Sequence, residues 1–380
     1  METKFIEYES DGIDVNNIYF TKYLITYIGN KRSLLPFLKK GFDDVRKSIG
    51  KREMVCLDGF SGSGCVSRLL KYYSSSLHTN DLEKYVETIN KCYLQSRYNP
   101  SQNINLKDIR DQIFILNKNK YKKVSSTGII RSLYSPIDDN NIKKEERVFY
   151  TNKNADIIDN IRQQIEFLPD NIKPFCLAPL LVEASIHVNT SGVFKGFHKN
   201  KKGIGQFGGK NRVALERICG EIELKSPMLS EIDCELRIYR KDINDLVSEL
   251  SDIDLTYYDP PYNQHPYGSN YFMLNIINDY KKPDEISNIS GIPKNWNKSS
   301  YNKRIDAEEA MDNLIKNTPS KYILISYNNE GIIPEKRFGE ILKKHGKVNI
   351  MRQVYNTYKG SRNLNNRSTK TEELLWIVKK

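Results

Sequence analysis

The sequence predicts an α/β fold, with a sheet of the nucleotide-binding type that is interrupted by a mainly helical insert. An apolar strand over residues 53–57 runs into a glycine-rich turn and then a helix, which is how such a sheet begins. A second apolar strand, at 253–258, runs into a pair of prolines. Between the two, residues 100–230 are rich in Lys, Asn and Ile, and their helical patterns are irregular. We therefore expect a core of residues 1–99 and 231–380 that is split by this insert.

Alternating elements follow the first strand. The turn at residues 58–64 reads Asp-Gly-Phe-Ser-Gly-Ser-Gly, and residues 66–72 form the helix after it. A second strand is expected at residues 75–80, ending at an Asn-Asp pair. The next helix covers residues 82–97, because its apolar residues recur at helical spacing. These elements extend the nucleotide-binding unit that the first strand begins.

The insert and the second half of the core have different textures. In the insert, the clearest helices cover residues 155–168 and 175–188, and the second is apolar enough to be buried. Residues 192–212 contain too many glycines for a helix or a central strand, so they predict an ordered loop. Further strands are expected at 234–239, 253–258, 322–326, 348–355 and 373–378, with a polar loop between the last two.

Composition excludes several classes of protein. The 380 residues carry 59 Lys and Arg against 47 Asp and Glu, a net charge of +12, and 11% of them are aromatic, which is too many for a disordered chain. No apolar run reaches the roughly 18 residues that span a membrane, and the acidic N-terminus lacks the apolar core of a secretory signal, so we expect a cytoplasmic protein. The scattered Cys and His residues show no metal-binding spacing, so we expect no metal. The basic excess favours a polyanionic partner.

The glycine-rich turn is the first candidate binding element. Its glycines let the backbone approach a ligand closely, and the helix that follows offers free N–H groups. Taken alone, these seven residues fit a tight strand-to-helix connection equally well. Asp81 strengthens the binding interpretation, because it ends the next strand, where nucleotide-binding sheets place the acid that holds ribose hydroxyls. Phe60 and the lack of a Walker lysine favour a nucleoside over a phosphate chain.

The stronger signal is Asp-Pro-Pro-Tyr at residues 259–262. Two prolines fix a rigid turn at the end of a strand. The Asp259 carboxylate and the Pro260 carbonyl can then both accept hydrogen bonds in one pocket, with the Tyr262 ring beside them. Two acceptors and a stacking face suit the amino group of a flat base, and they would turn its nitrogen lone pair toward an electrophile. A proline-rich surface turn is the alternative, which the apolar strand before the motif disfavours.

These two motifs together resemble the Dam-type adenine-N6 DNA methyltransferases in their alpha arrangement. A third match is Tyr27-Ile-Gly-Asn-Lys31, which is similar to the family's N-terminal segment. Residues 263–275 and the tail at 358–376 resemble the subset found in type II restriction–modification systems, near the FokI and NlaIII methylases. Two departures are small: Asn30 replaces a second Gly, and Asp58 stands where some members have Glu. The resemblance implies a Rossmann-like, S-adenosylmethionine-dependent methyltransferase sheet with a target-recognition insert at residues 100–230.

The resemblance also implies roles for single residues. Lys31 would lie near the methionine carboxylate of S-adenosylmethionine, Asp81 would hold the ribose, and Asp242 would meet the adenine edge of the cofactor. Asp259 would accept from the target amine, and Tyr262 would stack on the target base. The implied catalytic residues are Asp259, Pro260, Pro261 and Tyr262. The implied cofactor contacts are Tyr27, Gly29, Lys31, Asp58, Phe60, Gly62, Gly64, Asp81, Asp242 and Asp259.

An adenine within a duplex must be flipped out to reach such a pocket, so binding to the rest of the DNA has to offset the cost. Basic tracts are candidates for phosphate contacts, although each also fits a solvated surface. The tract at 195–212 is favoured because Phe194, Phe197 and Phe207 interleave with its charges. Such a loop could follow a groove or fill the space left by the flipped base. We expect His265 to have a packing or DNA-contact role. The predicted DNA contacts are Lys195, Lys199, Lys201, Lys202, Lys210, Arg212, Lys359 and Arg362.

Other acceptors stay open at this point. Cytosine-N4, RNA adenine and protein glutamine are alternatives, although Asp259 as the first residue of its motif favours adenine. A catalytically decayed DNA-binding protein is a further alternative, which the intact motifs disfavour. We expect a monomer from a prokaryote or a virus that acts on double-stranded DNA. A cognate restriction endonuclease is expected to share the system without forming a stable complex with it.

Overall fold

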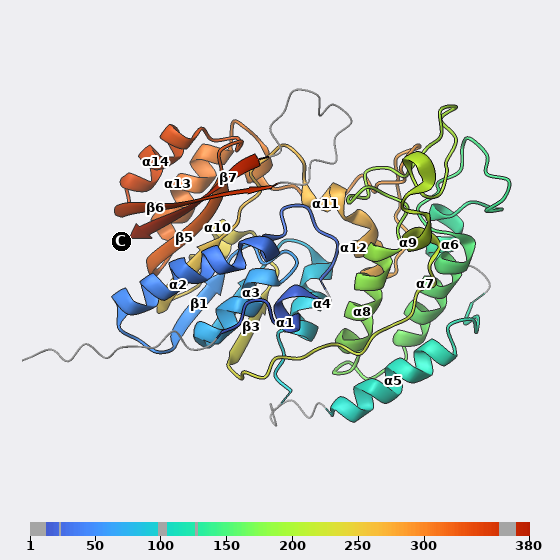
Figure 1. The fold of residues 1–380 in the computed structure, drawn as a ribbon, viewed down its shortest axis with the longest axis horizontal. Coiled ribbons are helices and arrows are strands. Elements are labelled where there is room, and N and C mark those ends of the chain that lie inside the picture. The colour runs from blue at the N-terminus through green and yellow to red at the C-terminus, as the bar shows by residue number, and fades with distance from the viewer. Residues whose placement is uncertain (1–12, 23, 98–104, 126–127, 357–369) are drawn as a thin grey trace, which may run out of the picture.

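The computed structural model describes residues 13–22, 24–97, 105–125, 128–356 and 370–380. One half of the molecule is a twisted sheet covered by helices, and the other half is a helical body beside it (Figure 1). This arrangement confirms the predicted Rossmann-like α/β fold.

The sheet has seven strands in the order β3-β2-β1-β4-β5-β7-β6. All neighbours from β3 to β5 are parallel, whereas β7 is antiparallel to both β5 and β6. The strand order reverses between β1 and β4, the kind of switch point where α/β sheets bind ligands. The strands are β1 (Met54–Asp58), β2 (Ser74–Asn80), β3 (Glu235–Tyr239), β4 (Ile253–Tyr258), β5 (Ser320–Asn328), β6 (Lys347–Asn356) and β7 (Lys370–Lys379).

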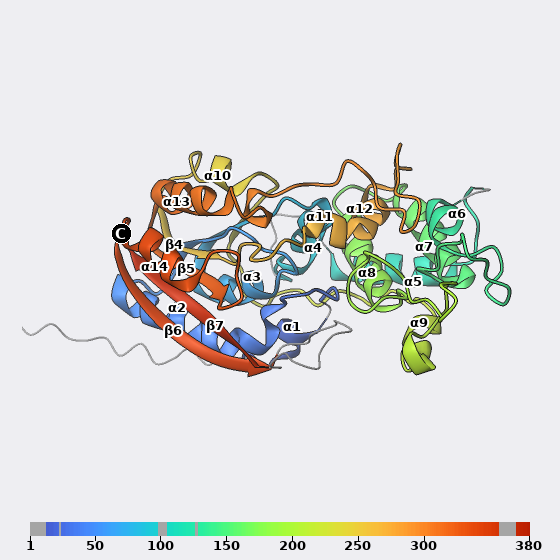
Figure 2. The same cartoon turned by 90° about the horizontal axis from the view of Figure 1, so that it is seen from above.

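Helices cover both faces of the sheet (Figure 2). Leu38 and Phe42 of one face pack in a cluster with Leu324 of β5, and Met311 and Phe338 pack in a separate cluster on the other face. The first face carries α1 (Ile18–Thr21), α2 (Leu35–Ile49) and α3 (Cys65–Leu70), and the second carries α10 (Ile243–Leu246), α13 (Ala307–Asn317) and α14 (Glu335–Lys343). Short 3-10 helices are η1 (Lys31–Leu34), η2 (Lys71–Tyr73), η4 (Lys210–Arg212) and η5 (Ser300–Asn302).

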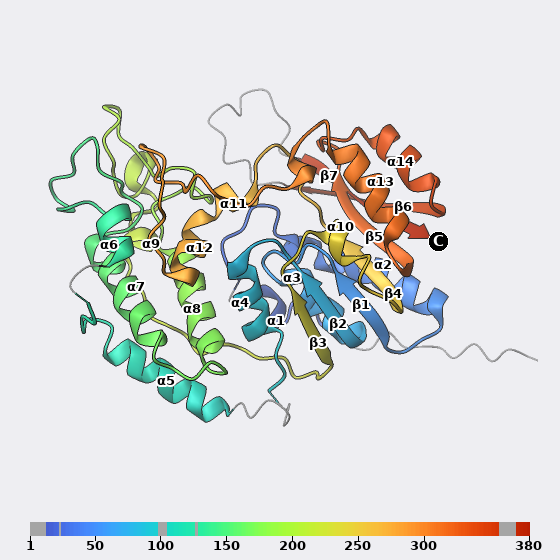
Figure 3. The same ribbon diagram turned by 180° about the vertical axis from the view of Figure 1, so that it is seen from behind.

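The helical half has its own apolar core, centred on the buried α8 (Figure 3). The helices of this half are α4 (Lys84–Tyr93), α5 (Leu106–Lys118), α6 (Ile129–Tyr134), α7 (Asn152–Ile165), α8 (Lys173–Ile186), α9 (Leu215–Cys219), α11 (Tyr267–Asn270) and α12 (Phe272–Asp279). Three of them come from outside residues 100–230, namely α4, α11 and α12. Tyr85 of α4 and Phe272 of α12 lie in the same cluster as the insert. The two halves are therefore joined by a shared core as well as by the chain.

The glycine-rich segment at 192–212 is held against the helical core by two of its phenylalanines. Phe194 and Phe197 are only 1% and 8% exposed, and they pack into the helical core, where the Phe197 ring lies 5.3 Å from that of Phe149. Phe207 is partly buried against the same core. The two buried rings therefore anchor the loop to the helical core, and its contact with a groove or with the space of a flipped base stays a prediction. Every helix in the described ranges is too short or too polar to traverse a bilayer.

Candidate active site

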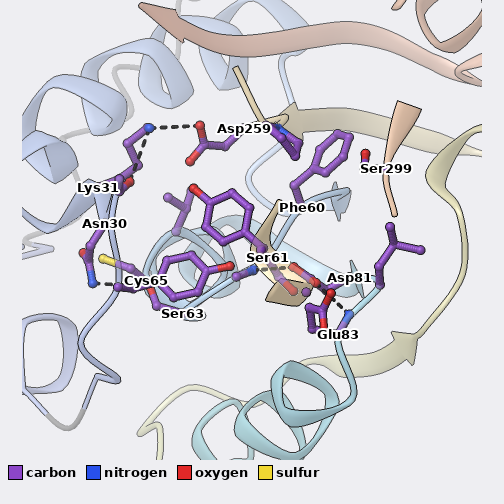
Figure 4. A pocket seen from close by; sticks show the side chains of 18 of the residues that line it. Asn30, Lys31, Phe60, Ser61, Ser63, Cys65, Asp81, Glu83, Asp259 and Ser299 are labelled. Atoms are coloured by element: carbon purple, nitrogen blue, oxygen red, sulfur yellow. Dashed lines mark hydrogen bonds and ion pairs between the residues drawn. The ribbon is translucent and has the colours of Figure 1, made fainter. Parts of the chain in front are cut away.

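A hollow of about 750 Å³ opens where β1, β2 and β4 end, at the switch point of the sheet (Figure 4). It brings together residues from distant parts of the chain that the sequence assigned to one site. Those that line it are Tyr27, Gly29, Lys31, Phe60, Gly62, Asp81, Asp259 and Pro261. Asp58, Gly64, Asp242, Pro260 and Tyr262 do not line it. Lys31 and Asp259 lie toward one end of the hollow, and Asp81 and Glu83 lie toward the other.

The glycine turn after β1 forms the floor of the hollow. Gly62 has a positive φ of 50°, and a Cβ there would lie 3.0 Å from the ring of Tyr27, so a side chain would close the space. Gly64 also has a positive φ, but it begins α3 and faces Asn90. Asp58 lies beneath the turn, where the Ser67 hydroxyl donates to it at 2.6 Å. Burial raises the pKa of Asp58 to about 7. Gly62 therefore provides access to the hollow, whereas Asp58 and Gly64 hold the turn.

Asp81 forms one wall, directly after β2. Its carboxylate accepts from the Gly62 N–H and from the Glu83 N–H, each at 2.9 Å, which fixes its direction. Burial raises the pKa of Asp81 to about 6, although these two bonds oppose the shift. Glu83 is a lining residue that sequence reasoning missed: it is 3% exposed, and burial raises its pKa to about 7. An acid two positions beyond Asp81 in the same turn was the available signal.

Asp259 lies at the end of β4 in an ion pair with Lys31. The Lys31 ammonium is 2.9 Å from Asp259 Oδ1 and 3.4 Å from Glu373 Oε1. Burial raises the pKa of Asp259 to about 6, with Lys31 opposing. Burial would lower the pKa of Lys31, but the carboxylates of Asp259 and then Glu373 raise it well above its usual value. The Lys31 ammonium and the Asp259 carboxylate thus stabilise each other's charged form in one buried place.

Tyr262 lies beside the Lys31–Asp259 ion pair but does not line the hollow. Its ring centroid is 5.6 Å from the Lys31 ammonium, and its hydroxyl would lie 3.2 Å from a Cβ at Gly29. The Tyr262 ring also packs edge-on against Tyr327, with 6.4 Å between centroids. Gly29, with a φ of 78°, therefore allows the N-terminal segment to pass close to the catalytic turn.

A group of stacked tyrosines forms the wall next to the helical half. The Tyr27 ring lies 5.0 Å from that of Tyr267 and 4.6 Å from that of Tyr271, and both pairs are stacked. The Ile28 N–H donates to the Tyr271 hydroxyl at 2.6 Å, and the Tyr267 hydroxyl donates to the Ile28 carbonyl at 3.2 Å. Tyr267 also lines the hollow, and the sequence assigned it no role. Its four-residue spacing from Tyr271 was the only signal.

Asp242 serves α10 in the structure. Its side chain accepts from the Asn244 N–H at 2.9 Å and so caps that helix, which begins directly after β3. The wall nearest the loop after α12 is formed by polar residues that the sequence did not single out, namely Asn297, Ser299 and Asn302. Contact between Asp242 and a cofactor stays a prediction.

The predicted DNA contacts are spread over the surface of the insert. Lys195 lies beside the catalytic turn: it shares a smaller hollow with Asn263, and its ammonium is 3.4 Å from Nδ1 of His265. The other described side chains are exposed at Lys199, Lys201, Lys202 and Arg212, and Lys210 belongs to η4. Lys359 and Arg362 lie outside the described residues. Lys195 and His265 thus connect the basic loop to the segment that follows Asp-Pro-Pro-Tyr.

Comparison with known proteins agrees with this site. The model of the D12 class N6 adenine-specific DNA methyltransferases matches residues 27–341. Type II methyltransferase M.NlaIII of Neisseria lactamica is 28% identical over 367 residues, which cover 94% of this chain and 99% of the relative. Type II methyltransferase M.CviAII of Paramecium bursaria Chlorella virus 1 is 27% identical over 344 residues, covering 88% and 93%.

Some relatives are longer. Type II methyltransferase M.FokI of Planomicrobium okeanokoites is 26% identical over 340 residues, which cover 88% of this chain and 48% of the relative. The chain therefore spans about half of that protein. The predicted Dam-type resemblance is confirmed, and the family's description names adenine N6 in DNA rather than cytosine, RNA or protein. The chain belongs to the D12 class of N6 adenine-specific DNA methyltransferases, and its chemistry is DNA adenine methylation.

Proposed function

We propose that this hollow binds S-adenosylmethionine and that Asp259 orients the amino group of an adenine flipped out of duplex DNA. The observation that carries the proposal is the Asp259 carboxylate, held by Lys31 at the rim of the hollow that Gly62 keeps open. When bound, S-adenosylmethionine supplies an electrophilic methyl group on a sulfonium centre.

The residues of the hollow fit such a cofactor. The Asp81 carboxylate is fixed by two backbone N–H groups, and its remaining lone pairs suit the hydroxyls of a ribose. Phe60 and Tyr27 offer aromatic faces to the adenosyl part, and Gly62 lets the backbone approach it. Lys31 offers a cation that a carboxylate can approach. Asp242 does not line the hollow, and its carboxylate caps α10, so its contact with the adenine edge of the cofactor stays a prediction.

Asp259 is suited to direct the attacking nitrogen. In its ionised form it accepts a hydrogen bond from the amine, and the Pro260 carbonyl is a second acceptor on the same rigid turn. Two such bonds fix the plane of the amine and aim its lone pair at the methyl carbon, which supplies much of the rate. The Tyr262 ring offers a stacking face beside them. After transfer, Asp259 is the nearest base for the proton that the methylated nitrogen gives up.

The helical half is proposed to recognise DNA. We assign residues 1–99 and 231–380 to catalysis and residues 100–230 to target recognition, with α12 supporting the second region from the core they share. Lys195 and His265 lie beside the catalytic turn, where phosphates flanking a flipped adenine would pass. The remaining lysines of the 192–212 loop would add contacts that are independent of sequence. A partner endonuclease without a stable complex, a monomeric state and a cytoplasmic location stay predictions.

Sequencing of modified bases tests the proposal directly. The chain is expressed in cells without other adenine methylases, and the modified adenines in the genome are mapped. We expect N6-methyladenine at one short motif, and none with Asp259→Ala, whose purified form should keep its DNA affinity in gel-shift titrations. Wild-type methylation by Asp259→Ala would overturn the role of Asp259.

A further inference from the structure

A buried cluster of three charges lies behind the catalytic turn. Lys31 and Glu373 are 4% and 1% exposed, and Asp259 is 20% exposed on its side chain. One ammonium lies between two carboxylates, so the cluster as ionised carries a net negative charge. The motif assigns functions to Lys31 and Asp259. Glu373 has no assigned function.

The topology of the sheet delivers Glu373 to this place. It lies in the first half of β7, paired with Asn328 at the end of β5 and with Gln353 of β6. Because β7 is antiparallel to β5, its beginning meets the edge at which the parallel strands end. The Glu373 side chain therefore reaches the Lys31 ammonium from β7, whereas Asp259 reaches it from the end of β4. The Tyr355 hydroxyl of β6 donates to Glu373 Oε2 at 3.3 Å and supports it there.

The second carboxylate is costly for the fold. Lys31 could neutralise Asp259 alone, and burying a further acid costs several kcal/mol unless hydrogen bonds compensate it. Among the described residues, the Lys31 ammonium is the one group that faces both Asp259 Oδ1, at 2.9 Å, and Glu373 Oε1, at 3.4 Å. A well-packed neutral residue would serve stability better than Glu373 does. A role in the reaction explains its presence.

We propose that Glu373 is a positioning residue that shares Lys31 with Asp259 and keeps the catalytic cluster anionic. This inference rests on the proposed role of Asp259. Because Asp259 shares the Lys31 ammonium with Glu373, the Asp259 carboxylate keeps lone pairs for the target amine. The net negative charge also stabilises the positive charge that the amine acquires in the reaction.

The charges balance through the step. The C–S bond to the methyl group breaks and its electron pair stays on sulfur, while the lone pair of the adenine nitrogen forms the new C–N bond. The nitrogen is cationic until it loses a proton, which Asp259 accepts and passes to solvent. A cluster of Lys31 and Asp259 alone would be neutral and would stabilise this cation less. The carboxylate of Glu373 supplies the additional negative charge.

Other titratable groups near Asp259 do not substitute for it. Tyr257, Tyr262 and Tyr267 lie close, but burial raises the pKa of each hydroxyl, so they stay neutral in the working range. Asp58 lies beneath the turn, with a pKa of about 7 because of burial. Burial has the largest influence on the pKa of Asp259 and raises it, whereas Lys31 lowers this pKa and Glu373 raises it. Removal of Glu373 should therefore favour the ionised form of Asp259, and removal of Lys31 should disfavour it.

The test compares Glu373→Gln with Glu372→Gln, which removes the same charge from the neighbouring, more exposed position paired with Arg352. Single-turnover methyl transfer is measured against pH. We expect Glu373→Gln to lose roughly 10- to 100-fold in rate at neutral pH, with DNA affinity retained. The acid limb of its profile should move to lower pH, whereas that of Lys31→Met should move to higher pH. Glu372→Gln should match the wild type.

Equal rates and equal acid limbs for the two Gln variants would overturn the proposal. If Glu373→Gln fails to fold, Glu373→Asp and Tyr355→Phe replace it: both keep the carboxylate, so both should retain the wild-type acid limb with a smaller loss of rate. A shifted limb in these two variants would contradict the assignment. Asp259→Ala distinguishes a failure of the proposed function from a failure of this inference. If it stays active, the proposed function fails, and if it is inactive while Glu373→Gln is normal, only this inference fails.

Discussion

The edge of the sheet that carries the hollow and the loop at residues 192–212 place their charges in opposite environments. At the sheet edge, Lys31, Asp259 and Glu373 are largely buried and constrain one another. In the loop, Phe194 and Phe197 are buried, and lysines such as Lys201 are exposed. The first region positions a few charges by packing, whereas the second anchors a backbone and displays many charges. Single substitutions should therefore have large effects at the edge and small, salt-dependent effects in the loop.

After Asp259→Ala, we expect Asp81→Asn to have the largest effect of the substitutions that test this contrast, and its effect should be on cofactor affinity. The amide keeps the size of the side chain but loses one acceptor and the charge, and a hydrogen bond to a charged group contributes about 1.5–3 kcal/mol. We expect a loss of roughly 10- to 150-fold in the affinity for S-adenosylmethionine by calorimetry, with DNA affinity kept.

Asp242→Ala is the matched comparison for Asp81→Asn. Asp242 caps α10 outside the lining, so its loss should leave cofactor affinity close to that of the wild type. A loss as large as that of Asp81→Asn would restore the contact predicted from the resemblance. Unchanged affinity in Asp81→Asn would remove the ribose assignment.

The pH dependence of methyl transfer should come from the sheet edge. Burial raises the pKa of Asp259 to about 6, and the proposed mechanism requires the ionised form to accept from the amine. The rate should therefore be full above this pKa and should fall about tenfold per pH unit below it. DNA affinity at the same pH values is the control, measured on the wild-type protein. The range from pH 5 to pH 7 covers about one unit on either side of this pKa. A rate that stays constant over that range under single-turnover conditions would show that ionised Asp259 is not required.

The same contrast explains which parts of the site could be predicted from sequence. Gly62, Asp81 and Asp259 belong to short motifs whose geometry is local, because a turn, a strand end or a pair of prolines determines it. Glu373 and Tyr267 reach the site through long-range packing: Glu373 depends on β7 inserting between β5 and β6, which no neighbouring residue encodes.

The fold was predictable to a greater extent than the surface. Strands such as β1 and β4 are mostly apolar and lead directly into motifs, so their positions follow from the sequence alone. Burial within the 192–212 loop does not, because alternating Phe, Lys and Gly have the same texture whether the rings face a core or DNA. The membership of α4 and α12 in the helical core likewise depends on tertiary contacts.

Lys201→Ala should show the smallest effect and is the sharpest test of the loop. Lys201 is exposed, so its removal should cost the fold little. If it contacts a phosphate, DNA affinity should fall a few-fold equally for target and non-target duplexes, and the salt slope of log affinity should become shallower by about 0.9. Lys343→Ala, at an exposed position of α14 in the sheet half, removes the same charge away from the loop. Because long-range attraction responds to net charge alone, a phosphate contact requires the Lys201 variant to lose more of the salt slope than the Lys343 variant does. Equal slopes in the two variants would show that the loop contributes only its general positive charge.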